Sequence, residues 1–177
     1  MRVITGTARG RKLKEPVGFD IRPTTDQVKE AIFNICQFDI EGRAVLDLFG
    51  GTGQLGIEAA SRGAASVDIV DQSRDALKLI RENVQTVGLD IRVVQADSIG
   101  FLRSCGKYDL IFIDPPYDSV LAEEAVKTIK EFDILSDGGI IICERPADKT
   151  LTDDYPGCSV WREYRHGSAA LTIFRKA

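Results

Sequence analysis

The chain has 177 residues, and its 44% hydrophobic and 28% charged content is enough for one domain with a real core. No apolar run approaches the length of a membrane span, and the first six residues lack the apolar segment of a signal peptide. The net charge of −4 conceals two basic ends: residues 1–30 carry seven Lys or Arg against four acids, and residues 160–177 carry four against one. Basic ends on an acidic body fit a surface for a polyanion, although solvated tails give the same pattern.

The N-terminal part of the chain is predicted to form a small β-hairpin and a helix. Short strands are expected at 2–5 and 12–14, on either side of a basic turn. Thr24 with Gln27 fits a capping box, which would start a helix over 25–37. One apolar stripe predicts that this helix packs on a core: Val28, Ala31, Ile32, Ile35 and Cys36.

From residue 44 onward, strand and helix patterns alternate. Strands are expected at 44–49, 66–70, 91–95, 109–113 and 139–143. Helices are expected between them, at about 55–62, from Ser73 to Gly88, at 98–104 and at 121–132. This repeated alternation predicts an α/β fold with a mainly parallel sheet and helices on both faces. Two further strands, 159–165 and 168–174, predict an antiparallel hairpin at the end of the chain.

The stretch 44–56 predicts a cradle for a nucleotide cofactor, because an apolar strand carrying Asp47 runs into three glycines and then a helix. A buried carboxylate is costly unless something bonds to it, and glycines let the backbone turn sharply beside a ligand. Gly51–Gly56 fits the G-x-G-x-x-G pattern of dinucleotide sites, with Asp71 as the ribose acid. Asp47–Gly53 instead resembles the D-x-F-x-G-x-G loop of class I methyltransferases, which bind S-adenosylmethionine (SAM). SAM has no phosphate, so acids for its amine and ribose favour the second interpretation.

Acids follow four successive strands, and ligands of open parallel sheets lie outside the carboxyl ends of the strands. A single acid at such a place is more often a cap or turn residue, whereas four beside a glycine loop favour a site. For SAM, we expect Asp71 at the ribose hydroxyls, Asp97 or a neighbouring amide at the adenine, and Asp47 at the methionine amine, directly or through water. Further cofactor contacts are expected from Phe49, Gly51, Thr52, Gly53, Gln72 and Ser98.

The segment Asp114-Pro115-Pro116-Tyr117 matches the [DNS]-P-P-[YFW] motif of methyltransferases that act on planar amino nitrogens. Such an amine is a poor nucleophile because its lone pair is delocalised into the ring. Asp114 and the Pro115 carbonyl can accept both N–H bonds, which favours a pyramidal nitrogen, and the prolines fix that carbonyl. Tyr117 offers a face on which a flipped-out base can stack. These four residues are the predicted catalytic group.

Metal and histidine chemistry is not expected. Cys36, Cys105, Cys143 and Cys158 show no C-x-x-C spacing, which predicts reduced, mostly buried thiols and no structural zinc. His166 is the only histidine, so a Ser-His-Asp triad or a multi-histidine metal site has little to work with.

The chain resembles the RsmD-type methyltransferases of bacterial 16S ribosomal RNA nearly from end to end. The Arg-Pro-Thr segment separates that family from other enzymes with the same catalytic motif. The departures are mild: Gly50 and Gln54 stand where small residues are common, and Gln27 and Lys29 replace usual arginines. The matching stretches are 2–6 with 9–13, 22–34, 46–49 with 51–53, 55–59 with 61–63, and 114–117.

The resemblance implies a Rossmann-like, metal-independent and SAM-dependent enzyme that methylates a guanine N2 of 16S ribosomal RNA, in free RNA or in a small-subunit assembly particle. It implies a cytoplasmic monomer with a substrate-side extension at residues 1–40 and a methyltransferase domain at 41–177. Substrate contacts would come from Arg9, Arg11, Arg22 and Thr24.

Three alternatives stay open at this point. The nearest is a SAM-dependent amino methyltransferase that acts on adenine N6 of DNA or RNA, or on a protein glutamine. An NAD(P)-dependent oxidoreductase would use the glycine loop as a dinucleotide site. A non-catalytic RNA-binding module would depend on the basic ends alone.

Overall fold

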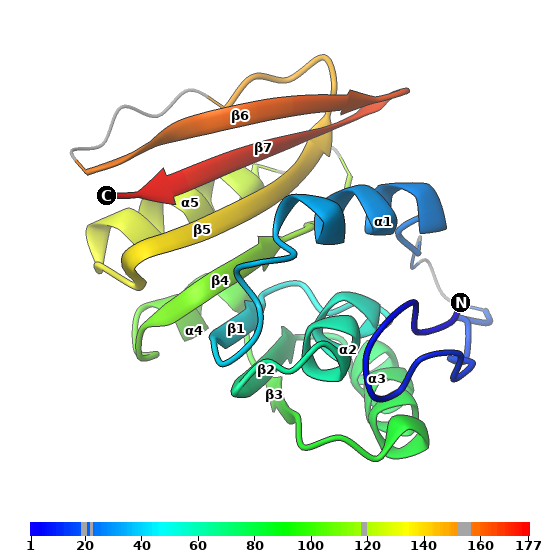
Figure 1. Cartoon of the computed structure of the whole chain (residues 1–177). Coiled ribbons are helices and arrows are strands. Elements are labelled where there is room, and N and C mark those ends of the chain that lie inside the picture. The colour runs from blue at the N-terminus through cyan, green and yellow to red at the C-terminus, as the bar shows by residue number, and fades with distance from the viewer. Residues whose placement is uncertain (19–20, 22, 118–119, 152–156) are drawn as a thin grey trace.

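A computed structural model describes residues 1–18, 21, 23–117, 120–151 and 157–177. Its centre is a seven-stranded sheet with the strand order β3-β2-β1-β4-β5-β7-β6 (Figure 1). Strands β1 to β5 pair in parallel, and β7 runs antiparallel to both β5 and β6. The expected parallel sheet with a final antiparallel hairpin is therefore confirmed. The strands are β1 (Ala44–Asp47), β2 (Ser66–Asp71), β3 (Arg92–Gln95), β4 (Tyr108–Ile113), β5 (Leu135–Pro146), β6 (Cys158–His166) and β7 (Ala169–Lys176).

Helices cover both faces of the sheet, as the alternating pattern predicted. One hydrophobic cluster joins the sheet to α1 and α2 and also contains Ile80 of α3, and a second joins the other face to α4 and α5. None of the described helices is both long and apolar enough to cross a membrane. The helices are α1 (Asp26–Ile35), α2 (Gln54–Ser61), α3 (Arg74–Val87), α4 (Ser98–Leu102) and α5 (Leu121–Glu131).

The chain folds back on itself where the N-terminal hairpin was predicted, but its strands are shorter than expected. The amides of Val3, Gly10 and Leu13 donate across the fold to the carbonyls of Arg11, Val3 and Met1, and among the described residues one antiparallel bridge forms, between Arg2 and Lys12. The pairing stops there because the amides of Ile4 and Thr5 donate to the carboxylate of Glu58 in α2, both at 2.9 Å. The segment lies beside α2 and α3 in Figure 1, and its residues Val3, Ala8 and Leu13 are part of the first hydrophobic cluster.

The capping residue of α1 is Thr25, not Thr24. The Thr25 hydroxyl accepts the amide of Val28, as an N-cap does. Thr24 is thereby free for another role, and its hydroxyl donates to the carboxylate of Asp114 at 2.9 Å. A Thr-Thr pair contains two candidate caps, and the sequence pattern does not distinguish them.

Strand β5 is longer than the predicted strand 139–143, because it continues across a bulge. Tyr108 of β4 pairs with Leu135, whereas Leu110 pairs with Ile140, so β5 holds extra residues between two paired stretches. The bulge contains Gly138 with a φ of 72°, a left-handed conformation that suits glycine. Its Asp-Gly-Gly sequence has the composition of a turn, so the sequence pattern did not indicate that the strand begins before it.

Candidate active site

The structure brings the predicted acids to one edge of the sheet. Asp47 and Asp71 are the last residues of β1 and β2, and Asp114 directly follows β4. Asp97 lies two residues after β3, where it caps α4. Because these four strands are parallel neighbours in the sheet, their carboxyl ends face the same edge. In the described part of the chain, no group of three His, Cys, Asp or Glu could hold a metal ion.

The glycine loop joins β1 to α2 through two residues in a left-handed conformation. Gly51 has a φ of 57° and Gly53 a φ of 81°, values that side-chain-bearing residues rarely adopt. The amide of Gly53 donates to the carbonyl of Gly50 at 2.7 Å, which closes a tight turn before α2 begins at Gln54. This backbone needs glycine at both positions and leaves the loop without side chains there, so a ligand can approach it.

Asp47 is buried beneath this loop, with 1% of its surface exposed. Its Oδ2 accepts the amide of Gly56 at 3.0 Å, so the carboxylate fixes the first turn of α2 to the end of β1. Burial raises the pKa of Asp47 well above its usual range, and the negative charges of Asp114 and Asp71 add to that shift. The free-energy cost of burying this carboxylate, which the sequence already indicates, is thus partly offset by a backbone hydrogen bond.

Asp71 braces the glycine loop and keeps room for a ligand. Its Oδ2 accepts the amide of Gly51 at 3.0 Å, and its Oδ1 accepts the amide of Ser73 at 2.8 Å. A carboxylate offers about four acceptor sites, so each oxygen retains capacity for a hydroxyl donor. The half-buried side chain therefore fits a ribose diol placed beside the loop.

The remaining residues predicted for the cofactor differ in how accessible they are. Asp97 is exposed, but its Oδ2 already accepts the amide of Gly100 at 2.8 Å. Ser98 is buried and donates to the carbonyl of Leu48 at 3.0 Å. Thr52 is buried in the loop, whereas Phe49 is half-buried and Gln72 exposed. Gln72 is therefore the polar side chain of this set that is both exposed and placed directly after Asp71.

Asp114 is held by two side chains from distant parts of the sequence. The hydroxyl of Thr24 donates to its Oδ2, and Glu144 of β5 lies next to it on the neighbouring strand. Burial raises the pKa of Asp114 to about 6, and hydrogen bonding by Thr24 and Glu144 opposes the shift. A carboxyl group with this pKa is mostly ionised near neutral pH and can still accept a proton.

Glu144 was missed in the sequence, although a signal was present. It follows the predicted strand 139–143 as directly as Asp114 follows β4, so the same rule of acids at strand ends would have selected it. The register pairs Ile113 with Cys143, which sets Asp114 opposite Glu144 on neighbouring strands.

A cavity of about 370 Å³ opens beside these two acids. Its wall includes Asp114 to Tyr117 and Glu144, with Lys149 among the other lining residues. Tyr117 is 50% exposed, and its hydroxyl donates to the carbonyl of Ser168 at 3.1 Å. That bond ties the tyrosine to the turn between β6 and β7 while its ring stays accessible. The volume lies at the lower end of the range for small-ligand pockets and suits a single base.

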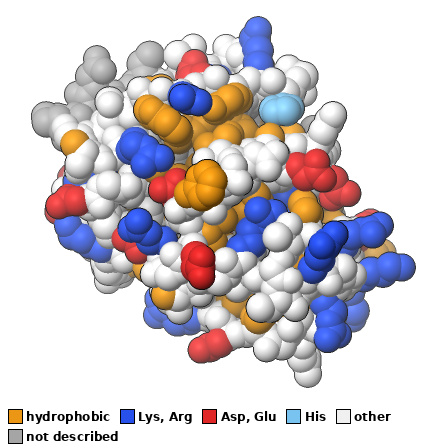
Figure 2. All heavy atoms as spheres, viewed as in Figure 1, with side chains coloured by type: hydrophobic (Ala, Val, Ile, Leu, Met, Phe, Trp, Pro, Cys, Tyr) orange, Lys and Arg blue, Asp and Glu red, His pale blue; other side chains and the backbone are white. Residues whose placement is uncertain are grey.

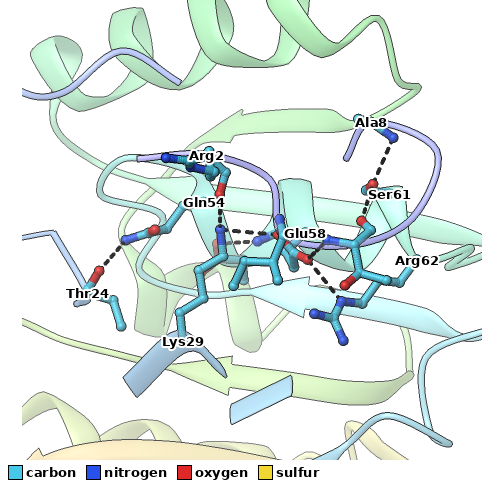
Figure 3. Close-up of polar contacts among 12 residues, drawn as sticks. Arg2, Ala8, Thr24, Lys29, Gln54, Glu58, Ser61 and Arg62 are labelled. Carbon is cyan, nitrogen blue, oxygen red and sulfur yellow. Dashed lines mark hydrogen bonds and ion pairs between the residues drawn. The ribbon is translucent and has the colours of Figure 1, made fainter. Parts of the chain in front are cut away.

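Two groups of polar contacts join α2 to the N-terminal part of the chain (Figure 3). Gln54, the first residue of α2, donates to the carbonyl of Thr24 at 2.9 Å. One turn further, Glu58 is fully buried and accepts from Arg62 at 3.0 Å. Lys29 of α1, also fully buried, lies 3.2 Å from the same carboxylate and donates to the carbonyl of Arg2. The buried Lys29 therefore has a structural role, which removes it from the surface that RNA could contact.

The residues predicted to contact the substrate lie in three different settings. Arg9 and Arg11 are exposed on the N-terminal segment. That segment is fixed to α2, because the amide of Ala8 donates to the hydroxyl of Ser61 at 3.0 Å. Thr24 contacts Asp114, as described above. Arg22 lies outside the described residues.

A second hollow, of about 330 Å³, lies between α1 and β6 and shares no lining residue with the cavity beside Asp114. Trp161 is 42% exposed there, with the guanidinium groups of Arg162 and Arg175 at 4.5 and 4.6 Å from its ring centre. Figure 2 shows hydrophobic and basic side chains lying side by side on the face that carries α1 and β6. The basic end at 160–177 includes Trp161, Arg162 and Arg175, but the sequence did not indicate that they meet α1.

Comparisons with known proteins extend over the whole chain. A family model described as "Conserved hypothetical protein 95" matches residues 1–175. YlbH of Bacillus subtilis (strain 168) is 35% identical over 182 residues, which cover 99% of each chain. Ribosomal RNA small subunit methyltransferase D of Escherichia coli (strain K12) is 33% identical over 178 residues, covering 99% of this chain and 90% of that one. The solved structure of yhhF from Escherichia coli has a TM-score of 0.89 at 32% identity, covering 99% of this chain and 97% of that chain.

Proposed function

The chain belongs to the family described as "Conserved hypothetical protein 95", the RsmD family, and on this premise we propose that it methylates the exocyclic N2 of one guanine in 16S ribosomal RNA. SAM-dependent methylation of ribosomal RNA follows from the family. The guanine and its N2 atom are the proposal. The family also decides between the two interpretations of the glycine loop in favour of SAM, so the oxidoreductase alternative is set aside.

The observation that carries the proposal is the Asp114–Tyr117 motif at the carboxyl end of β4, beside a cavity of about 370 Å³ with a second acid in its wall. Asp114 and the Pro115 carbonyl accept the two N–H bonds of the amine, which directs its lone pair away from the ring. Tyr117 stacks on the base, a contact that contributes about 1–3 kcal/mol in comparable sites. Bound SAM supplies an electrophilic methyl carbon on its sulfonium. Asp114 then takes the proton that the amine releases.

The cofactor lies along the glycine loop in this proposal. Asp71 accepts hydrogen bonds from the ribose hydroxyls, for which both of its oxygens retain capacity. Asp47 acts through the loop, because its buried carboxylate is bonded to the amide of Gly56. Asp97 or the amide beside it meets the adenine. The other cofactor contacts are assigned to Phe49, Gly51, Thr52, Gly53, Gln72 and Ser98.

The substrate side is formed by the N-terminal residues 1–40 against the domain 41–177. Arg9 and Arg11 are placed on the RNA because they are exposed on a segment that is fixed to α2. Arg22 keeps its expected place on the RNA, and Thr24 reaches the base through Asp114. The enzyme works as a cytoplasmic monomer on 16S ribosomal RNA or a small-subunit assembly particle.

The test is to incubate the protein with labelled SAM and small subunits from a strain that lacks it, followed by mass spectrometry of the ribosomal nucleosides. We expect N2-methylguanosine from 16S RNA. Label in N6-methyladenosine would instead support an enzyme that methylates adenine N6, because the Asp114–Tyr117 motif can also bind the amine of adenine. Asp114→Ala should reduce turnover by roughly 100- to 1,000-fold. The same variant should keep the thermal shift that SAM produces, which separates catalysis from cofactor binding.

A further inference from the structure

Glu144 faces the same cavity as Asp114, from the neighbouring strand. The Ile113–Cys143 register places the two acids side by side at the carboxyl edge, and both line the cavity of about 370 Å³. Two carboxyl groups therefore line one cavity from neighbouring strands. Two adjacent acids at a base-sized cavity are not needed to hold a single amine.

We propose that Glu144 is the specificity-determining residue of this site and that it accepts the N1–H of the guanine while Asp114 accepts an N–H of the N2 amine. The inference rests on the proposed guanine N2 function and deepens it. Guanine carries N1–H and the N2 amine next to each other, so its edge presents two donors to two adjacent acids. Each donor gives one carboxylate a hydrogen-bond partner, so both acids can be ionised while guanine is bound.

Other bases match this pair less well. Adenine and 2-aminopurine both have a lone pair at N1, which would face an oxygen of Glu144. With either base, an ionised Glu144 would face a lone pair and would gain no donor from the base. A site built to bond a donor discriminates strongly against an analogue that lacks it, because its own acceptor is left without a partner.

The experiment compares guanine with 2-aminopurine at the methylated position. Both bases carry the N2 amine, and they differ at N1–H and at the 6-oxygen. The substrate is 16S RNA in which a ligated synthetic segment carries one base or the other, and kcat/KM is measured at pH 8. We expect the wild-type protein to prefer guanine by roughly 10- to 100-fold, the effect of one hydrogen bond to a charged group.

Glu144→Gln should reduce that preference by at least about tenfold. The amide can offer its oxygen to the guanine N1–H or its NH2 group to the N1 of 2-aminopurine, so it serves both bases. Glu123→Gln is the matched control, because Glu123 lines the same cavity from α5 but is exposed and lies on a different element. The control should keep the wild-type preference. Thermal unfolding with and without SAM shows whether each variant is folded, and Glu144→Asp provides a second variant that keeps the acid.

The possible outcomes distinguish a failure of this inference from a failure of the proposed guanine N2 function. N2-methylguanosine formation with an equal base preference in wild type and Glu144→Gln overturns the role of Glu144 alone. A methyl group on adenine N6 overturns the guanine assignment and the role of Glu144 together. A preference that falls in Glu144→Gln and stays in Glu123→Gln and Glu144→Asp supports the inference, because a merely structural defect would slow both substrates equally.

Discussion

At the scale of single residues, the chemistry depends on how Asp114 is held. Its neighbours are Thr24 from the N-terminal segment, Glu144 from β5 and, at longer range, Asp47 at the end of β1. Burial raises the pKa of Asp114 to about 6, so the protein keeps a proton acceptor close to its working range. An exposed aspartate with an ordinary pKa near 3.9 would be a weaker base for the released proton.

The pH dependence follows from that value. Asp114 must be ionised to accept the amine proton, and a raised pKa means that it becomes protonated already as the pH falls through about 6. We expect kcat/KM to fall tenfold per pH unit below about 6. Asp114→Asn keeps an acceptor oxygen but cannot take the proton, so it should be about 100-fold slower. It should also lose the acid limb of the profile, which is the fall in kcat/KM below about pH 6. An unchanged acid limb in the variant would assign the ionisation to another group.

The hydroxyl of Thr24 lowers the pKa of Asp114, against the larger effect of burial. Because its hydrogen bond favours the ionised form, Thr24→Val should move the acid limb to higher pH, by about one unit for a bond to a charged group. Thr25→Val is the control, since Thr25 caps α1 and has no contact with Asp114 recorded. It should lower the free energy of unfolding by about 1 kcal/mol and leave the pH profile in place. Equal pH profiles in both variants would contradict the role of Thr24.

At the scale of elements, α1 and α2 are joined by a buried ion pair that sequence periodicity does not reveal. The apolar stripe of α1 correctly predicted the packing of Val28, Ile32 and Cys36. Lys29 lies next to that stripe and is fully buried against Glu58. Burial lowers the pKa of Lys29, and the nearby Glu58 opposes the shift. A lysine in a helix is normally assigned to solvent, and only the tertiary partner shows otherwise.

This ion pair predicts that removing one of its charges destabilises the protein more than removing both. Glu58→Gln leaves the Lys29 charge buried with a weaker partner, and we expect a loss of about 3–5 kcal/mol in the free energy of unfolding. The double variant Lys29→Met with Glu58→Gln removes both charges and should be more stable than Glu58→Gln alone. Urea unfolding of the two single variants and the double variant measures this coupling. Additive losses would show that the two charges do not depend on each other.

Most elements could be predicted because their signals are local. Strand–helix alternation, the Ser73 cap and the Gly88 stop all agree with the structure. The strand expected at 2–5 is cut short for a non-local reason, since the amides of Ile4 and Thr5 bond to Glu58, more than fifty residues away. The same holds at the site, where strand ends predicted the positions of Asp47, Asp71 and Asp114. Their partners Gly56, Thr24 and Glu144 depend on the register and contacts of the folded chain.

At the scale of the whole molecule, the fold belongs to the Rossmann-like methyltransferases, as the sequence predicted. The acidic total charge of the chain is not spread evenly over its surface. Arg9 and Arg11 are exposed on the N-terminal segment, whereas the acids at the carboxyl edge are buried, half-buried or engaged in hydrogen bonds. A polyanion would therefore meet local basic groups on a protein of net charge −4.

The salt dependence of RNA binding tests this arrangement. Arg9→Glu with Arg11→Glu should weaken binding and reduce the slope of log K against log salt by about 1.5–2, because two phosphate contacts are lost. Arg103→Glu with Lys127→Glu makes the same change of charge at exposed residues of α4 and α5 or their ends, on the other face of the sheet. That control should leave the slope within error of the wild type. Equal slopes in all three proteins would remove the N-terminal segment from the RNA surface.

The attachment of residues 2–8 to Glu58 and Ser61 has a consequence for dissecting the chain. A deletion of these residues would do more than remove the proposed RNA contacts. It would expose the buried Lys29 to water. It would also remove the two amide donors that bind the carboxylate of Glu58 in α2, the helix that follows the glycine loop. Truncated versions should therefore lose heat resistance and cofactor affinity together, and point substitutions at the exposed arginines are the cleaner tool for studying RNA contact.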